Sequence, residues 1–257
     1  MSIIKYLGLM DTMARMALRA DASRYFLGYL WWLLEPLLFV AVFYVVFELI
    51  LDTGRGDFLV FLMCGKLAFI WFSKSVNQAS NSIPANKGLI GRINVTKTLF
   101  PLSVIQEGVY RQIAVFLLLF CFLFVSGVSP DPTWLSLVPI ILVNYLMIVA
   151  CSLVGACLVC VVRDFSMVIS LAMTFLLFTS GIFWDVRALG DPDKTAMVLA
   201  LNPLAFILDA YRQVLMHNTA PDWHHLLLIG CGSFVLLVMT VLLMRRFSRY
   251  LALRALS

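Results

Sequence analysis

Charged and amide side chains inside long apolar segments are the residues of this sequence best suited to chemistry. Glu35 lies early in one such segment, and Lys66 and Lys74 lie in the next. A charge inside a bilayer is costly unless it is paired or hydrated. If the two segments form an antiparallel helical hairpin, Glu35 and Lys74 reach similar depths and can pair. The alternative is that Glu35 reaches the headgroups while Lys74 extends its stem toward the interface.

A stripe of polar residues recurs within the second apolar segment. Lys66, Ser73, Asn77 and Asn81 share one face of a helix predicted over 58–83. A polar stripe in a spanning helix faces water or protein rather than lipid. It either lines a conduit or bonds a neighbouring helix, and the sequence favours neither.

Aromatic residues crowd the start of the first apolar segment, at Tyr25, Phe26, Tyr29, Trp31 and Trp32. Such crowding is typical of the aromatic belt at a membrane interface. The alternative function is a stacking surface for sugar rings. Both can hold at once, because consecutive residues point in different directions.

Motifs for catalysis are absent from the sequence. It contains no GxxxxGK[ST], HExxH or GxSxG pattern, so no phosphate-binding loop or zinc protease site is predicted. His224 and His225 are adjacent and diverge by about 100° on a helix, which disfavours joint metal binding. The six cysteines lie in apolar runs and are interpreted as packing residues. We therefore predict no catalytic site, no metal site and no cofactor bound by this chain.

The composition indicates that lipid is the solvent for most of the chain. Of its 257 residues, 62% are hydrophobic and 13% are charged, with a mean hydropathy of +0.97. Soluble domains carry about 25% charged residues. A bilayer core needs about 20 apolar residues in a helix. The sequence therefore predicts an all-α membrane protein with six transmembrane helices, at 28–51, 58–83, 103–126, 134–162, 165–184 and 223–244.

The basic residues predict the orientation of these spans. One side of the predicted topology holds thirteen of them, and the other holds only Arg55, Arg187, Lys194 and Arg212. Cytoplasmic loops are enriched in Lys and Arg. Both termini are therefore predicted to be cytoplasmic. The net charge of +5 follows from this topology, and no binding of nucleic acid is expected.

Two segments are predicted to be helical without spanning the membrane. Residues 2–21 form an amphipathic pattern, typical of a helix in the cytoplasmic interface. Residues 185–222 contain a shorter apolar face within 201–216, which suits a short re-entrant or interfacial helix on the outer side. The predicted organisation is an interface helix over 1–24 followed by a transmembrane domain over 25–257.

Four stretches in the same order resemble the ABC-2-type polysaccharide export permeases. They are LGYLWWLLEP (27–36), the segment 58–105 that includes PANKGLIGR, RDF (163–165) and NPLAFILDAYRQVLM (202–216). These permeases are membrane subunits that export O-antigen, capsular polysaccharide or teichoic acid. The resemblance covers nearly the whole chain.

The resemblance implies a half-transporter in the bacterial inner membrane. Two copies would form the pore for a lipid-linked polysaccharide among membrane lipids, and each copy would dock a separate ATPase subunit that binds ATP and Mg. A coupling segment near 84–100 would contact the ATPase. Its expected contact residues are Asn86, Lys87, Gly88 and Leu89.

The resemblance and the polar stripe together predict the path of the substrate. The conduit residues are Tyr29, Trp31, Trp32, Glu35, Lys66, Ser73 and Asn77, and those of the outer exit are Asn202, Pro203 and Arg212. Two alternatives stay open. One is an ABC-2 exporter of a lipid or drug. The other is a membrane-bound glycan-modifying enzyme, which would need acidic or histidine clusters at a membrane face.

Overall fold

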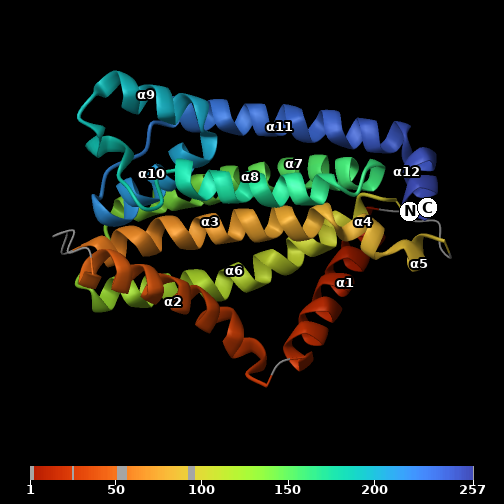
Figure 1. Ribbon diagram of the computed structural model, residues 1–257, viewed down its shortest axis with the longest axis horizontal. Helices are drawn as coiled ribbons and strands as arrows, with labels where there is room; N and C mark the ends of the chain where they lie inside the picture. The colour runs from red at the N-terminus through yellow and green to blue at the C-terminus, as the bar shows by residue number, and fades with distance from the viewer. Residues whose placement is uncertain (1–2, 25, 51–56, 92–95, 257) are drawn as a thin grey trace.

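A computed structural model describes residues 3–24, 26–50, 57–91 and 96–256, and every regular element in them is helical (Figure 1). Tyr25, Arg55 and Arg92 lie outside the described residues. The main helices are α1 (Ile3–Arg24), α2 (Trp31–Tyr44), α3 (Phe58–Ser80), α4 (Ser82–Ala85), α5 (Lys87–Ile90), α6 (Leu99–Val125), α7 (Leu137–Val161), α8 (Phe165–Thr179), α9 (Pro192–Leu201), α10 (Pro203–Met216), α11 (Trp223–Arg246) and α12 (Ser248–Leu256). Four shorter turns are η1 (Gly28–Leu30), the π-helical η2 (Val45–Ile50), η3 (Pro132–Ser136) and η4 (Val186–Leu189).

The least apolar of the four helices long enough to span a membrane lies at the centre of the bundle. In α3 the most apolar window has a mean hydropathy of 1.6 and is 78% buried, while α11 has 2.7 and 17%. Helix α3 packs against α6, α7 and α10. A helix with charged and amide groups gains protein partners there, whereas an apolar helix such as α11 can face lipid at little cost.

The number of spans is four by length and apolar character, or five if the bent pair α9–α10 counts as one. The predicted count of six is therefore not confirmed. The segment predicted at 28–51 forms η1, α2 and η2 in succession, and α8 has 15 residues where a span of 165–184 was expected. Helix α8 ends early because Gly181 adopts a left-handed φ of 70°.

The predicted short helices before the last span are α9 and α10, which meet at an angle of 113°. The bend has a local cause. Asn202 caps the N-terminus of α10, and Pro203 occupies its first turn, where a missing N–H costs nothing. Twelve consecutive residues of α10, from Leu204 to Leu215, are buried, so this helix is held within protein.

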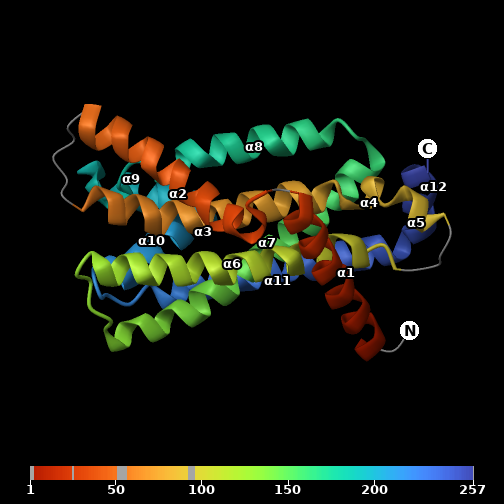
Figure 2. The same cartoon turned by 90° about the horizontal axis from the view of Figure 1, so that it is seen from below.

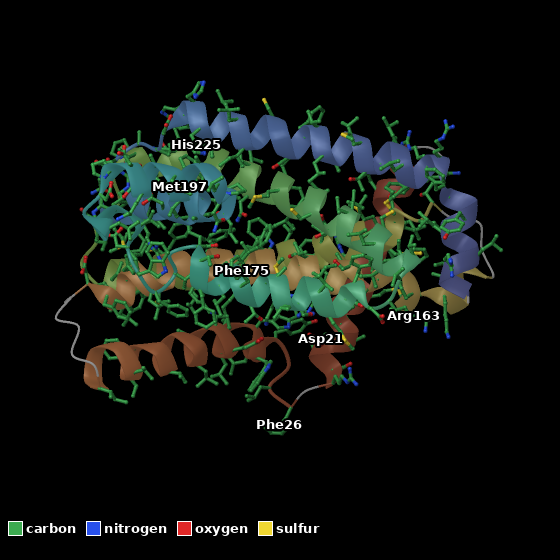
Figure 3. All side chains as sticks on the ribbon, turned by 45° about the horizontal axis from the view of Figure 1, so that its top comes forward. Asp21, Phe26, Arg163, Phe175, Met197 and His225 are labelled. Carbon is green, nitrogen blue, oxygen red and sulfur yellow. The ribbon has the colours of Figure 1, made fainter. Side chains whose placement is uncertain are left out.

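The two chain termini lie at one end of the bundle, together with α4, α5 and α12 (Figures 1 and 2). The Cys160 thiol of α7 donates to the carbonyl of Leu251 in α12 at 3.3 Å, and the Tyr6 and Thr98 hydroxyls are 3.0 Å apart. Arg163, in the α7–α8 link, lies toward the same end (Figure 3). Helices α9 and α10 lie at the opposite end (Figure 1).

Helix α1 crosses α6 at a steep angle, and its N-terminal part projects beyond the bundle (Figure 2). Ala14, Leu18 and Ala22 are buried, whereas Leu7 and Met16 are exposed by 50% and 65%. The predicted apolar face is therefore divided. Its C-terminal half packs on protein, and Leu7 remains open to the surroundings.

Candidate functional site

An ion pair joins α2 to α3 near the turn that follows α1. The Lys74 ammonium donates to a Glu35 carboxylate oxygen at 2.5 Å. The side chains of Lys74 and Glu35 are 43% and 31% exposed. Of the two alternatives that the sequence left open, the ion pair is therefore the one that forms, and neither residue is left alone in an apolar surrounding.

Arg111 of α6 is the centre of an adjoining polar cluster. Its Nη2 lies 3.0 Å from Asp21 Oδ2 and also donates to Glu107. Its guanidinium lies 5.3 Å from the ring centre of Trp32. The Trp32 indole in turn donates to Asp21 at 3.3 Å. One arginine thus connects α1, α2 and α6 at a single point.

The aromatic residues at the start of α2 divide between this cluster and the surface. The rings of Tyr29 and Trp32 meet edge to face at 4.8 Å. Tyr29 is 55% exposed and Trp31 is 37% exposed, while Phe26 projects from the tip of the V formed by α1 and α2 (Figure 3). Tyr29 and Trp31 therefore form an exposed aromatic ridge beside Trp32, which is held by its hydrogen bond to Asp21. Such a division is expected if consecutive residues have different roles.

The predicted polar stripe on α3 meets different surroundings along its length. The Ser170 hydroxyl of α8 donates to Asn77 Oδ1 at 3.1 Å, so Asn77 bonds a neighbouring helix. Ser73 is half-buried one turn away. Lys66 lies nearer the other end of α3, 4% exposed, with its ammonium 5.5 Å from the Phe69 ring centre and 6.0 Å from that of Phe183. The structure does not bring Lys66 close to the Glu35–Lys74 pair.

The predicted coupling segment forms two single-turn helices at the end that holds the termini. Asn86 separates α4 from α5, and its side chain donates to the carbonyl of Ser82 at 2.7 Å. Lys87, Gly88 and Leu89 are exposed. Helix α12 packs against α4 and α5. The turn is therefore supported by α12, and it exposes the basic side chain of Lys87 and the apolar side chain of Leu89.

Asn202 and Pro203, predicted for the outer exit, organise the α9–α10 corner. The side-chain oxygen Oδ1 of Asn202 accepts from the backbone N–H groups of Leu204 and Ala205 at 3.1 Å, and its side-chain Nδ2 donates to Ser180 Oγ at 3.0 Å. Pro203 is exposed at the start of α10. The corner is therefore anchored to the end of α8.

Arg212, the third predicted exit residue, lies inside the protein at 4% exposure. Its guanidinium donates to the carbonyls of Phe61, Gly181 and Ile182 at 3.2, 2.6 and 3.1 Å. It also lies 3.5 Å from the ring centre of Phe61. Within one chain Arg212 cross-links α10, α3 and the turn after α8.

Asp21, Glu107 and the contacts of Tyr110 were not predicted from the sequence. Tyr110 of α6 donates to Asp11 of α1, and Asp11 pairs with Arg15 at 2.9 Å. A signal was present in the sequence, because Glu107 and Arg111 are four residues apart and Asp11 and Arg15 have the same spacing. The spacing within one helix does not show which second helix each pair contacts.

The polar side chains described above hold neighbouring helices together, and others lie on the surface of the protein. Among the described residues, no group of three or more His, Cys, Asp or Glu side chains could hold a metal ion. The charged groups of the α1–α2–α3–α6 junction are bonded to one another. The exposed surface includes the aromatic side chains Tyr29 and Trp31 and the turn from Lys87 to Leu89.

Comparison with known proteins identifies the kind of chain that carries these features. Residues 22–216 match the family model described as ABC-2 type transporter. The chain is 26% identical over 239 residues to an O-antigen export system permease protein of Myxococcus xanthus, covering 91% of this chain and 90% of that protein. It is 28% identical over 195 residues to such a permease of Klebsiella pneumoniae, covering 75% and 74%. It is 25% identical over 206 residues to a polysialic acid transport protein of Escherichia coli, covering 77% and 78%. With the family model covering most of its length, the chain belongs to the ABC-2 type transporters.

Proposed function

We propose that this chain is the permease subunit of an ATP-driven exporter of a cell-surface polysaccharide. The substrate is a lipid-linked glycan of the O-antigen or capsule kind. Two copies form the conduit in the bacterial inner membrane, and each binds a separate ATPase subunit. Both termini face the cytoplasm.

One observation carries the proposal. The similarity to an O-antigen export permease extends over 91% of this chain and 90% of that protein. At that coverage it must include the coupling segment and the α9–α10 corner together. A likeness confined to the apolar helices would carry less weight, since spanning helices of many proteins share their composition.

The structure supports the substrate class through the chemistry of the exposed residues. A glycan is recognised by aromatic faces and hydrogen bonds, and Tyr29 and Trp31 offer such faces beside the hydrogen-bonded Trp32. A lipid carrier needs an apolar surface. An apolar groove of about 780 Å³ between α8, α9 and α11, with Phe175, Met197 and Leu236 in its walls, offers one (Figure 3).

The structure supports ATPase coupling through the end that holds α4, α5 and α12. Lys87, Gly88 and Leu89 are exposed there on a turn backed by the buried Ile90. A supported turn transmits force better than a free loop, because its displacement moves the helices on which it packs. The basic residues at this end also support a cytoplasmic location for it.

Deletion of the gene followed by measurement of surface polysaccharide tests the proposal. We expect the deletion strain to lose the polymer from its surface and to accumulate it inside, with export restored by the wild-type chain. The purified chain should bind its ATPase subunit and should stimulate ATP hydrolysis when lipid-linked glycan is added. Normal surface polysaccharide in the deletion strain, together with an ATPase rate that ignores the glycan, would contradict the proposal.

A further inference from the structure

Helix α12 lies across the end of the bundle that holds the coupling segment (Figures 1 and 2). The chain changes direction at Phe247, whose φ of −100° and ψ of 18° end α11. Helix α12 then packs against α4, α5 and α7. The end of the last span therefore turns onto the coupling segment instead of continuing away from the bundle.

One face of α12 fixes it to the bundle. Leu251 is 1% exposed, and its backbone carbonyl accepts from the Cys160 thiol of α7 at 3.3 Å. Successive residues of an α-helix turn by about 100°, so Leu253 lies about 200° from Leu251 around the helix axis. Leu253 accordingly points away from α7, and it is 70% exposed.

The outward face of α12 combines apolar and basic side chains. Tyr250 is 44% exposed and adjoins Leu253 and Arg254, at helical spacings of three and four residues. The Nε of the exposed Arg254 donates to the Tyr250 hydroxyl at 3.1 Å, and its guanidinium lies 5.7 Å from the centre of that ring. The arginine is thus already held in place, so less side-chain freedom is lost when a partner binds it.

This outward face continues onto the coupling turn. Lys87 and Leu89 of α5 are exposed at the same end of the bundle, and α5 contacts α12. Helices α4, α5 and α12 contain no acidic residue. We call the exposed residues of the two helices the α5–α12 surface: Lys87, Leu89, Tyr250, Leu253 and Arg254. A partner that fits this surface combines apolar side chains with carboxylates.

The position of α12 favours a protein partner over a lipid surface. A basic amphipathic helix binds a membrane by turning its apolar face into the lipid. In α12 the buried Leu251 faces the bundle, and the helix contacts α4 and α5. The outward face is therefore continuous with the turn expected to contact the ATPase subunit, and one partner can cover both.

We propose that the outward face of α12 is a second part of the docking surface for the ATPase subunit. This inference rests on the proposed function. An apolar and acidic patch of the ATPase subunit covers Tyr250 and Leu253, and its carboxylates pair with Lys87 and Arg254. Because α12 follows directly from α11, a movement of the bound ATPase reaches the last span as well as the helices on either side of the coupling turn.

Cysteine labelling of the full chain in lipid nanodiscs tests this surface. The variants Leu253→Cys, Leu89→Cys and Leu189→Cys each add one thiol, and mass spectrometry measures its reaction with a water-soluble maleimide. We expect saturating purified ATPase subunit to slow labelling at least fivefold at positions 253 and 89. Leu189→Cys is the control, because that exposed position lies beside the α9–α10 corner at the opposite end, and its rate should not change.

The labelling rates separate this inference from the proposed function. Protection of position 89 without protection of position 253 would overturn the inference and leave the proposed function intact. Protection of neither position would contradict the ATPase contact itself, and the inference with it. Slower labelling of position 253 in anionic than in neutral nanodiscs, before any ATPase subunit is added, would assign the face to lipid and also overturn the inference.

The binding affinity provides a second measurement. We expect Leu253→Asp to weaken binding of the purified ATPase subunit at least tenfold, because a carboxylate replaces an apolar contact and repels acidic groups. Its unfolding midpoint should stay near that of the wild type, since Leu253 is exposed. Leu189→Asp should bind as the wild type does. Undiminished binding by Leu253→Asp would overturn the inference.

Discussion

The Lys74 ammonium lies 2.5 Å from the Glu35 carboxylate and joins α3 to α2 across a helical hairpin. Helix α2 is otherwise held through Trp32, whose indole bonds Asp21 of α1. Several residues on α2 face outward, including Leu38 and Val42 at 50% and 59% exposure. The pair is therefore one of a small set of polar contacts that fix α2 against the bundle.

Neutralising one member of this pair should destabilise the chain modestly. We expect Glu35→Gln or Lys74→Met to lower the free energy of unfolding by about 1 kcal/mol, since both side chains remain partly exposed. The exchange Glu35→Lys with Lys74→Glu should recover most of that loss. Thermal unfolding followed by tryptophan fluorescence measures it. Lys194→Met, which removes an exposed pair with Asp191, is the control and should change little. Full stability in both single variants would contradict a role for the pair.

Removing Arg212 should have a larger effect, because its guanidinium bonds three buried carbonyls. We expect Arg212→Met to lower the free energy of unfolding by about 3 kcal/mol. Arg212→Lys should recover only part of this, since an ammonium cannot reproduce the planar fork. The same unfolding measurement applies. Arg246→Met, at an exposed position on α11, should stay within about 0.5 kcal/mol of the wild type. A loss equally small at Arg212 would show that the cross-link is dispensable.

A charge on the coupling turn should uncouple ATP hydrolysis from export without unfolding the chain. We expect Leu89→Asp to reduce surface polysaccharide and glycan-stimulated ATPase activity at least tenfold, because Leu89 is exposed and offers an apolar contact. Its unfolding midpoint should remain near that of the wild type. Leu189→Asp is the matched control, at 40% exposure beside the α9–α10 corner, and should keep both activities. Equal activity of the two variants would count against this turn as the ATPase contact.

The attachment of α1 to α6 should weaken only in acid. The hydrogen bond from Tyr110, followed by the charge of Arg15, lowers the pKa of Asp11 below its ordinary 3.8. A lowered pKa means that the folded state favours the carboxylate, so this stabilisation is complete above about pH 4 and is lost as the pH falls through the folded-state pKa. We expect Tyr110→Phe to be less stable than the wild type at pH 7, with the difference in unfolding midpoint shrinking by pH 3. Tyr29→Phe, at an exposed ring, should show no such difference. A pH-independent difference for Tyr110→Phe would mean that Asp11 is not the group involved.

The lengths of the apolar segments predicted four long helices, with small errors in where they begin and end. The predicted segments 58–83, 103–126, 134–162 and 223–244 correspond to α3, α6, η3–α7 and α11. The two other predicted spans did not form as single long helices, because 28–51 is divided into η1, α2 and η2 and α8 stops at Thr179. Gly181 ended α8 before the predicted limit of 184, and the left-handed φ at that glycine depends on the turn that follows.

Polar residues were harder to assign than helices. Glu35 and Lys74 were matched by depth alone, because an antiparallel hairpin fixes which residues share a level. Arg111 was counted only as a basic residue of the topology, and its bonds to Asp21 and Glu107 were not foreseen. The sequence shows how deep in the membrane a residue of a spanning helix lies. It does not show which neighbouring helix that residue faces.

The sequence by itself determined that lipid surrounds this chain, where its long helices run, and that Glu35 and Lys74 share a level. These properties follow from apolar length and residue spacing, which are local. Only the tertiary structure decided that Arg212 is an internal cross-link and that Arg111 of α6 meets Asp21 of α1 and Trp32 of α2. Each of those depends on the relative rotation and tilt of helices distant in sequence. In a bilayer, hydrophobicity does not select that packing, because lipid is as apolar as the helix surfaces. Close packing and a few polar contacts select how the helices pack, and these contacts can be seen only in the tertiary structure.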